Sequence, residues 1–133
     1  MAELEVIGLK KRFASQEVLK GISFSLEKGK VLSIIGSSGG GKTTICHLIP
    51  AFYEISDGQI LIDGMDIRGI TKESLRRQIG IVQQDIYLFN ASIKDNILYG
   101  RLDAKDEEVV EAAKRANIHD YIMSLEHGYE ILL

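Results

Sequence analysis

A glycine-rich run followed by a lysine and two threonines is the part of the chain best suited to chemistry. Residues 36–44 read Gly36-Ser37-Ser38-Gly39-Gly40-Gly41-Lys42-Thr43-Thr44, which fits the phosphate-binding pattern G-x-x-x-x-G-K-[ST]. Glycines let successive backbone N–H groups point at one anion, and a helix that follows adds the positive end of its dipole. We expect all nine residues to bind nucleotide, with Lys42 at the outer phosphates and the Thr43 hydroxyl on Mg²⁺.

The flanking segments predict how this phosphate loop is held. The apolar residues 31–35 predict a strand before it, and residues 43–49 predict a helix after it. Residues 4–9 and 22–27 alternate apolar and polar positions, as half-exposed strands do, and the polar residues 10–21 predict a turn between them. The loop is therefore expected between a central strand and a helix.

The remaining elements alternate between short strands and helices. Strands are expected over residues 59–62 and 79–83, and helices over residues 72–78 (capped by Thr71), 93–98 (capped by Ser92 or Asn90), 104–116 (capped by Asp103) and 119–125. This order predicts an α/β fold with antiparallel strands at the N-terminus and a helical segment at the C-terminus. We expect one domain of 133 residues, with a core over residues 1–85 and a helical portion over residues 86–133.

Composition excludes some classes of function. The net charge is −3 and no basic stripe is present, which argues against a nucleic-acid partner. Cys46 is the single cysteine, so no disulfide is expected within the chain, and its helical pattern predicts a buried position. No apolar run is long enough to span a bilayer and the N-terminus is unlike a signal peptide, so a cytoplasmic location is expected.

Two further segments narrow the possibilities for the phosphate loop. Residues 79–85 read IGIVQQD, and residues 88–97 read LFNASIKDNI. Together with the loop, they resemble the ATP-binding domain of ABC transporters, in which a glutamine loop and an LF-x-x-[TS]-I-x-[ED]-NI segment follow in this order. The resemblance runs over nearly the whole chain. It implies a P-loop NTPase-type core, ATP or ADP as ligand with Mg²⁺ as cofactor, and a transmembrane domain as partner at the inner membrane face.

The resemblance also assigns roles to residues outside the loop. An aromatic residue ahead of the second strand stacks on adenine in this family, and Phe13 stands at the matching place; such stacking contributes about 1–3 kcal/mol. Gln84 matches the glutamine that contacts Mg²⁺ and the attacking water, with Gln83 as the alternative if the register shifts by one. The resemblance therefore implies Lys42 and Gln84 as catalytic residues and Thr43 and Gln84 as metal ligands. Residues 84–100 would face the transmembrane partner.

Other motifs of the family do not occur in these 133 residues. There is no LSGGQ-like signature, no apolar strand ending in Asp and followed by a catalytic Glu (the Walker B region), and no switch histidine. Positioning of water and neutralisation of charge dominate phosphoryl transfer, so we expect MgATP or MgADP binding with little or no hydrolysis by the chain alone. The core is expected to be truncated, with an open sheet edge through which the chain could self-associate.

The two parts of the chain resemble different branches of the family. Residues 1–45 look like amino-acid importer subunits and residues 46–133 like an exporter domain, which suggests a chimera or fragment, or an unusual natural member. One alternative function is an engineered or truncated half-domain made to test folding, with residual nucleotide binding or none. Another is a small P-loop enzyme such as a nucleotide kinase, whose lid would need Arg68, Arg76 and Arg77.

Overall fold

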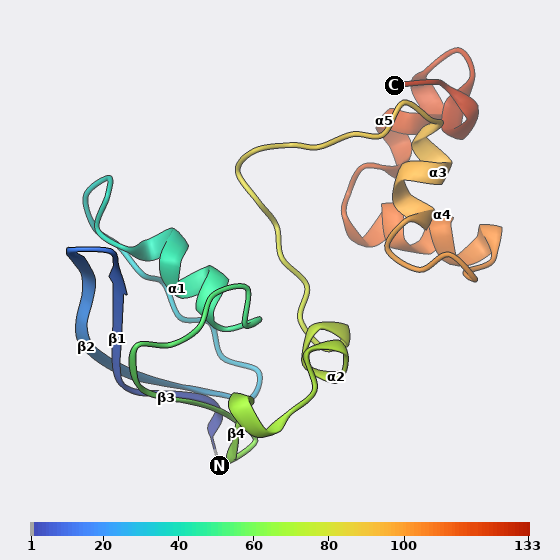
Figure 1. Cartoon of the computed structure of the whole chain (residues 1–133). Helices are drawn as coiled ribbons and strands as arrows, with labels where there is room; N and C mark the ends of the chain where they lie inside the picture. The colour runs from blue at the N-terminus through green and yellow to red at the C-terminus, as the bar shows by residue number, and fades with distance from the viewer. Residues whose placement is uncertain (1) are drawn as a thin grey trace. The chain divides into compact units, whose positions relative to one another are not determined.

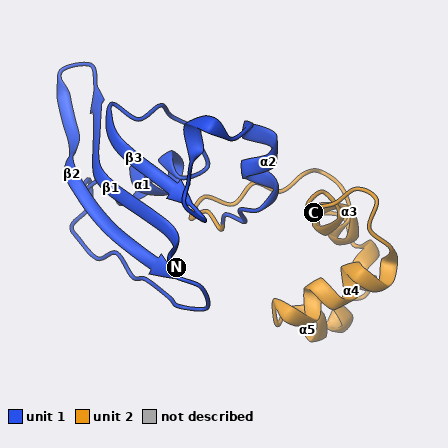
Figure 2. Ribbon diagram, turned by 90° about the horizontal axis from the view of Figure 1, so that it is seen from below, with its two compact units in different colours: residues 1–81 blue, residues 82–133 orange. Residues whose placement is uncertain are grey.

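A computed structural model describes residues 2–133 as two compact units, residues 2–81 and residues 82–133 (Figure 2). The boundary between them lies between Ile81 and Val82, close to the division after residue 85 that the sequence suggested. Unit 1 holds the sheet and the phosphate loop, and unit 2 holds the C-terminal helices. The family-level fold prediction, α/β with antiparallel N-terminal strands and C-terminal helices, matches these elements.

The elements follow the chain in a simple order (Figure 1). Those of unit 1 are β1 (Ala2–Phe13), β2 (Gln16–Glu27), α1 (Lys42–Leu48), β3 (Asp57–Ile62), β4 (Met65–Asp66), a 3₁₀ turn (Ile67–Gly69) and α2 (Lys72–Arg77). Those of unit 2 are α3 (Ile93–Leu98), α4 (Asp106–Arg115), α5 (His119–Ser124) and a 3₁₀ turn (Gly128–Glu130).

The sheet of unit 1 is antiparallel, with strand order β2-β1-β3-β4. β1 and β2 form a long hairpin in which Phe13 pairs with Gln16 and Lys11 with Leu19. The turn expected over residues 10–21 is therefore wrong, because β1 and β2 continue through most of it. The polar side chains of residues 10–21 are compatible with strands because one face of a hairpin can be exposed to water. Leu19, in the same stretch, is buried in the core.

The core of unit 1 lies between the sheet and the helix that follows the phosphate loop. Its buried members come from three strands, α1, the 3₁₀ turn and α2: Val6, Leu9, Leu19, Ile45, Leu48, Ile60, Ile67 and Leu75. Ile45 and Leu48 are three residues apart, so they share one helical face and turn it toward the sheet. Cys46 falls on another face of the helix and is exposed, so its predicted burial is wrong.

Two apolar segments expected as strands do not form them. Residues 31–35 and 79–83 have no strand assignment, and Val31 and Ile35 are 93% and 94% exposed. An apolar segment becomes a central strand only when neighbours pair with its backbone and cover its side chains. Within residues 2–133 neither segment has such a neighbour, which is the physical reason for the difference.

In unit 2, the residues at the start of α3 are hydrogen-bonded to the C-terminal residues. The Ile93 N–H donates to the Ile131 carbonyl (3.0 Å) and the Leu133 N–H to the Ala91 carbonyl (3.1 Å). Its buried residues are Val109 and Ala113 of α4, Ile122 of α5 and Ser92. In the described part of the chain, no helix combines the length and the apolar character needed to cross a bilayer.

Helix caps test the local sequence signals directly. Thr71 accepts a hydrogen bond from the Ser74 N–H and Ser92 from the Asp95 N–H, so both predicted caps are confirmed. The Asp103 cap is wrong, because α4 begins at Asp106 with Lys105 as its N-cap. The Lys105 N–H donates to the Glu108 carboxylate (3.0 Å), which draws the helix start past Asp103.

Gly58 gives a test of the β1–β3 contact. Its φ is +91°, and a Cβ there would lie 2.5 Å from the Gly8 carbonyl oxygen and 2.6 Å from that of Ile7. We predict that Gly58→Ala lowers the free energy of unfolding by about 2–3 kcal/mol, because neither backbone atom can move freely. Urea denaturation followed by circular dichroism measures the change.

Gly69→Ala is the matched control, since a Cβ there would meet nothing within 4 Å. We expect it to stay within about 0.5 kcal/mol of the unmodified chain. Equal stability of the two variants would contradict the close β1–β3 approach.

Candidate functional site

The phosphate loop packs directly on the β1–β2 hairpin. Gly41, at the N-cap of α1, has φ +82°, and a Cβ there would lie 2.7 Å from Leu19 Cδ2 and 3.3 Å from Val18 Cγ1. A glycine permits both the left-handed backbone and the close approach. The loop end and the start of α1 are therefore fixed against β2.

The Lys42 side chain turns back into the loop. Its ammonium donates to the Gly36 carbonyl (2.8 Å) and to the Ser37 carbonyl (2.7 Å), and the Gly40 N–H donates to the same Ser37 carbonyl (3.2 Å). The loop thus surrounds one cationic group with its own backbone. A phosphate oxygen is a stronger partner for an ammonium than a neutral carbonyl, so this arrangement suits an exchange of carbonyl contacts for phosphate.

The other loop residues are open to solvent. Residues 36–40 and Thr43 are exposed, whereas Thr44 is partly buried on α1. The Thr43 hydroxyl is an oxygen donor of the kind that Mg²⁺ prefers. In the described residues no three His, Cys, Asp or Glu side chains are grouped to hold a metal ion.

Phe13 is the last residue of β1, at the end of the hairpin that supports the loop. The register of the hairpin relates Phe13 to the phosphate loop. Gly41 packs against Leu19, and Leu19 pairs with Lys11, two positions before Phe13. Phe13 is 39% exposed, so part of the residue is accessible to a ligand. In unit 1, the phosphate loop therefore packs against the same hairpin that contains Phe13.

An aromatic and cationic cluster around Phe13 was missed by the sequence reasoning. The Tyr53 ring lies 5.3 Å from the Phe13 ring, nearly perpendicular to it at 86°, and the Lys11 ammonium is 4.9 Å from the centre of the Phe13 ring. His47 of α1 lies 5.6 Å from Tyr53. No local pattern links residues 13 and 53, because Phe13 ends β1 whereas Tyr53 lies in the segment between α1 and β3, and only tertiary packing brings them together.

An ion pair ties β1 to β3 beside this cluster. Lys10 Nζ lies 3.0 Å from Asp57 Oδ2, and this hydrogen bond, together with the Gly58 N–H, lowers the pKa of Asp57 below its usual range. The same bond raises the pKa of Lys10. Both groups are exposed, so the pair orients the strand ends more than it stabilises the fold.

Gln84 belongs to unit 2, in a stretch where residues 80–90 are exposed and form no helix or strand. The segment just after it is better ordered. The Asn96 side chain accepts a hydrogen bond from the Phe89 N–H (2.8 Å) and donates to the Phe89 carbonyl (3.1 Å) and the Ser92 carbonyl (2.9 Å). The Phe89 ring also packs against Tyr99. One asparagine thus holds the LFNAS segment to α3.

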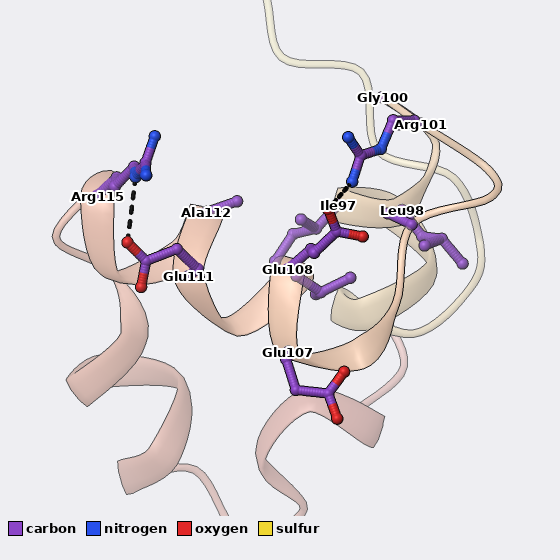
Figure 3. A pocket seen from close by; sticks show the side chains of 11 residues that line it. Ile97, Leu98, Gly100, Arg101, Glu107, Glu108, Glu111, Ala112 and Arg115 are labelled. Atoms are coloured by element: carbon purple, nitrogen blue, oxygen red, sulfur yellow. Dashed lines mark hydrogen bonds and ion pairs between the residues drawn. The ribbon is translucent and has the colours of Figure 1, made fainter.

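A cavity of about 540 Å³ lies between α3 and α4 of unit 2 and contains none of the predicted site residues (Figure 3). Its aliphatic lining includes Ile97 and Val109. Arg101 is paired with Glu108, and Arg115 lies 3.1 Å from Glu111, as the dashed lines in Figure 3 show. Both arginines are thus neutralised by neighbours, and the cavity offers no evident chemistry.

The three arginines needed by a kinase-like lid are engaged elsewhere. Arg68 pairs with Asp66 (2.6 Å), Arg77 with Glu73 (2.7 Å), and Arg76 donates to the carbonyls of Pro50 and Ala51 (both 3.0 Å). Each of these contacts stabilises the local structure of unit 1. None of the three arginines is therefore held in the way that a kinase-like lid would need.

Comparisons with known proteins show the family to which the chain belongs. A sequence model for the family described as ABC transporter matches residues 19–128. A Staphylococcus aureus protein (strain NCTC 8325 / PS 47) named as a multidrug export ATP-binding/permease protein is 57% identical over 113 residues, which is 85% of this chain and 20% of that protein. Its counterpart in strain bovine RF122 / ET3-1 is 56% identical over the same length.

A solved structure is also similar. The structure of a bacterial Atm1-family ABC exporter with ATP bound matches 98% of this chain and 23% of its own chain, with a TM-score of 0.92 and 42% sequence identity. The chain thus spans about a fifth of the length of the curated relatives it matches.

Proposed function

This chain belongs to the ABC transporter family, as an ATP-binding domain sequence, and on that premise we propose that unit 1 binds MgATP and MgADP through the phosphate loop. One observation carries the proposal: the Lys42 ammonium lies inside a glycine loop that packs on the hairpin ending in Phe13. The relative with ATP bound, at 42% identity over nearly the whole chain, supports it.

The phosphates and the base of a nucleotide are bound by different kinds of group, and unit 1 contains candidates for both. Residues 36–44 supply backbone N–H groups and one cation for the phosphates. The Phe13 ring is the proposed stacking surface for adenine. In this proposal Lys42 neutralises the outer phosphates, and it does so by leaving the carbonyls of Gly36 and Ser37.

The donors present fit Mg²⁺ as a partner of the nucleotide. Mg²⁺ is usually held by one or two protein oxygens together with substrate phosphates, and the exposed Thr43 hydroxyl is one such oxygen. Gln84 of unit 2 stays a second metal contact that is predicted from the sequence resemblance alone. When bound, the ion would neutralise charge on the outer phosphates.

The proposal also covers ATP hydrolysis by these residues and their location in the cell. The 133 residues contain the phosphate loop but no Walker B Asp and no catalytic Glu, so we propose that these residues alone bind nucleotide with little or no hydrolysis.

The relatives are named as ATP-binding/permease proteins, and we propose that residues 84–100 meet a transmembrane domain at the cytoplasmic face of a membrane. Self-association through an open sheet edge stays a prediction.

Lys42→Ala tests the phosphate loop. We predict that it weakens MgATP binding roughly 10- to 150-fold, because hydrogen bonds to charged groups contribute about 1.5–3 kcal/mol. Calorimetric titration of the 133-residue chain with MgATP measures the change. Lys28→Ala, an exposed lysine in the turn after β2, is the matched control and should bind as the unmodified chain does. Equal affinity of Lys42→Ala and the unmodified chain would reject the loop as the site.

Gln84→Ala tests the metal contact. We predict that the gain in ATP affinity caused by Mg²⁺, measured against ATP in EDTA, shrinks about 2- to 10-fold, the effect of one polar contact. Gln83→Ala is the neighbouring control and should keep the full Mg²⁺ effect. The opposite result, loss with Gln83→Ala alone, would shift the register of the glutamine loop by one residue.

A further inference from the structure

We infer that Tyr53 is a positioning residue of the nucleobase site: it holds the Phe13 ring at the angle that a stacked base requires. The inference rests on the proposed function, since it assigns a new residue to that same site. It starts from the contact between two half-exposed rings, Phe13 at 39% and Tyr53 at 43%, from parts of unit 1 that are 40 positions apart in the chain.

The contact is specific in geometry. The ring centres are 5.3 Å apart and the planes are perpendicular within a few degrees, at 86°, which is the edge-to-face arrangement that aromatic quadrupoles prefer. The Lys11 ammonium lies 4.9 Å from the centre of Phe13 and 5.9 Å from that of Tyr53, so one cation is shared by both rings. Lys11 also donates a hydrogen bond to the Glu54 carbonyl, which fixes it to the same segment as Tyr53.

Phe13 needs the contact with Tyr53 because it lies at the end of a strand. It ends β1 and is followed by a two-residue turn, so its own strand restrains it on one side only. A stacking surface contributes to affinity in proportion to how well it is ordered before the ligand arrives. A perpendicular neighbour restricts the ring while leaving ring surface open, as the exposure of Phe13 shows.

Tyr53 is itself anchored to the helix that follows the phosphate loop. His47 of α1 lies 5.6 Å from the Tyr53 ring and 5.9 Å from the Phe52 ring. From α2, the Arg76 guanidinium lies 4.8 Å from the Phe52 ring and donates to the carbonyls of Pro50 and Ala51. The segment after α1 is therefore held from two sides. Through Tyr53, the helix that carries Lys42 also sets the position of Phe13.

A purely structural cluster would have a different consequence. If the rings only stabilised unit 1, their loss would weaken every ligand of the unit to a similar degree. If Tyr53 positions the base platform, its loss acts on ligands that carry a base and spares those that do not. Inorganic tripolyphosphate with Mg²⁺ is the probe without a base, because it offers the phosphate loop the same chemistry as ATP.

The experiment compares MgATP and Mg-tripolyphosphate on the 133-residue chain by calorimetry. For Tyr53→Leu we expect MgATP binding to weaken about three- to tenfold, the range for loss of one aromatic pair, with tripolyphosphate binding unchanged. Tyr53→Phe keeps the ring and should bind MgATP within about twofold of the unmodified chain. Tyr121→Leu, at an exposed tyrosine of α5 in unit 2, is the matched control and should change neither affinity.

Lys11→Gln is the second variant, which removes the shared cation and keeps both rings. We expect it to act in the same direction as Tyr53→Leu and on MgATP only. The inference is overturned if Tyr53→Leu binds MgATP as the unmodified chain does, or if it weakens tripolyphosphate to the same degree. Failure of the unmodified chain to bind either ligand is a distinct outcome, because it rejects the proposed function as a whole.

Discussion

The contact between the Gly41 backbone and the side chains of Val18 and Leu19 is the constraint on which the candidate site depends. It fixes where the phosphate loop ends and where α1 begins, and α1 then covers the sheet with Ile45 and Leu48. Because the same hairpin carries Phe13, one packing contact sets the spacing between a cation for phosphates and a ring for a base. A side chain at this position would strain the backbone, whose φ is +82°, and would force the Leu19 side chain to shift.

The chemistry of unit 1 is divided between backbone and side chains. The phosphate end relies on main-chain groups and on Lys42, which the loop holds with its own carbonyls. The aromatic end relies on packing among Phe13, Tyr53 and Lys11. The cavity between α3 and α4 of unit 2 contains none of these residues, and its charged groups include two ion pairs, Arg101–Glu108 and Arg115–Glu111. The site is therefore recognised from motif and geometry together, rather than from enclosed volume.

Local signals in the sequence predicted much of this architecture, and the family was identified correctly from three short motifs. The caps at Thr71 and Ser92 follow from one residue and its neighbours, and both are confirmed. Residues 31–35 were predicted as a strand from their apolar character, but a strand depends on partners that a local pattern does not contain. The Phe13–Tyr53 contact was missed for a related reason, since the two residues meet only when the segment after α1 packs beside the end of β1. The roles of Lys42, Thr43 and Gln84 stay predictions.

The most direct test of the central claim is to locate bound nucleotide on the chain by solution NMR. Backbone amide signals of the isotope-labelled 133-residue chain would be followed during titration with MgATP. We predict that the largest shifts fall on residues 36–44 and, in the same titration, on Phe13 and its neighbours in the β1–β2 hairpin. Shifts confined to the α3–α4 cavity of unit 2, or no shifts at saturating MgATP, would contradict it.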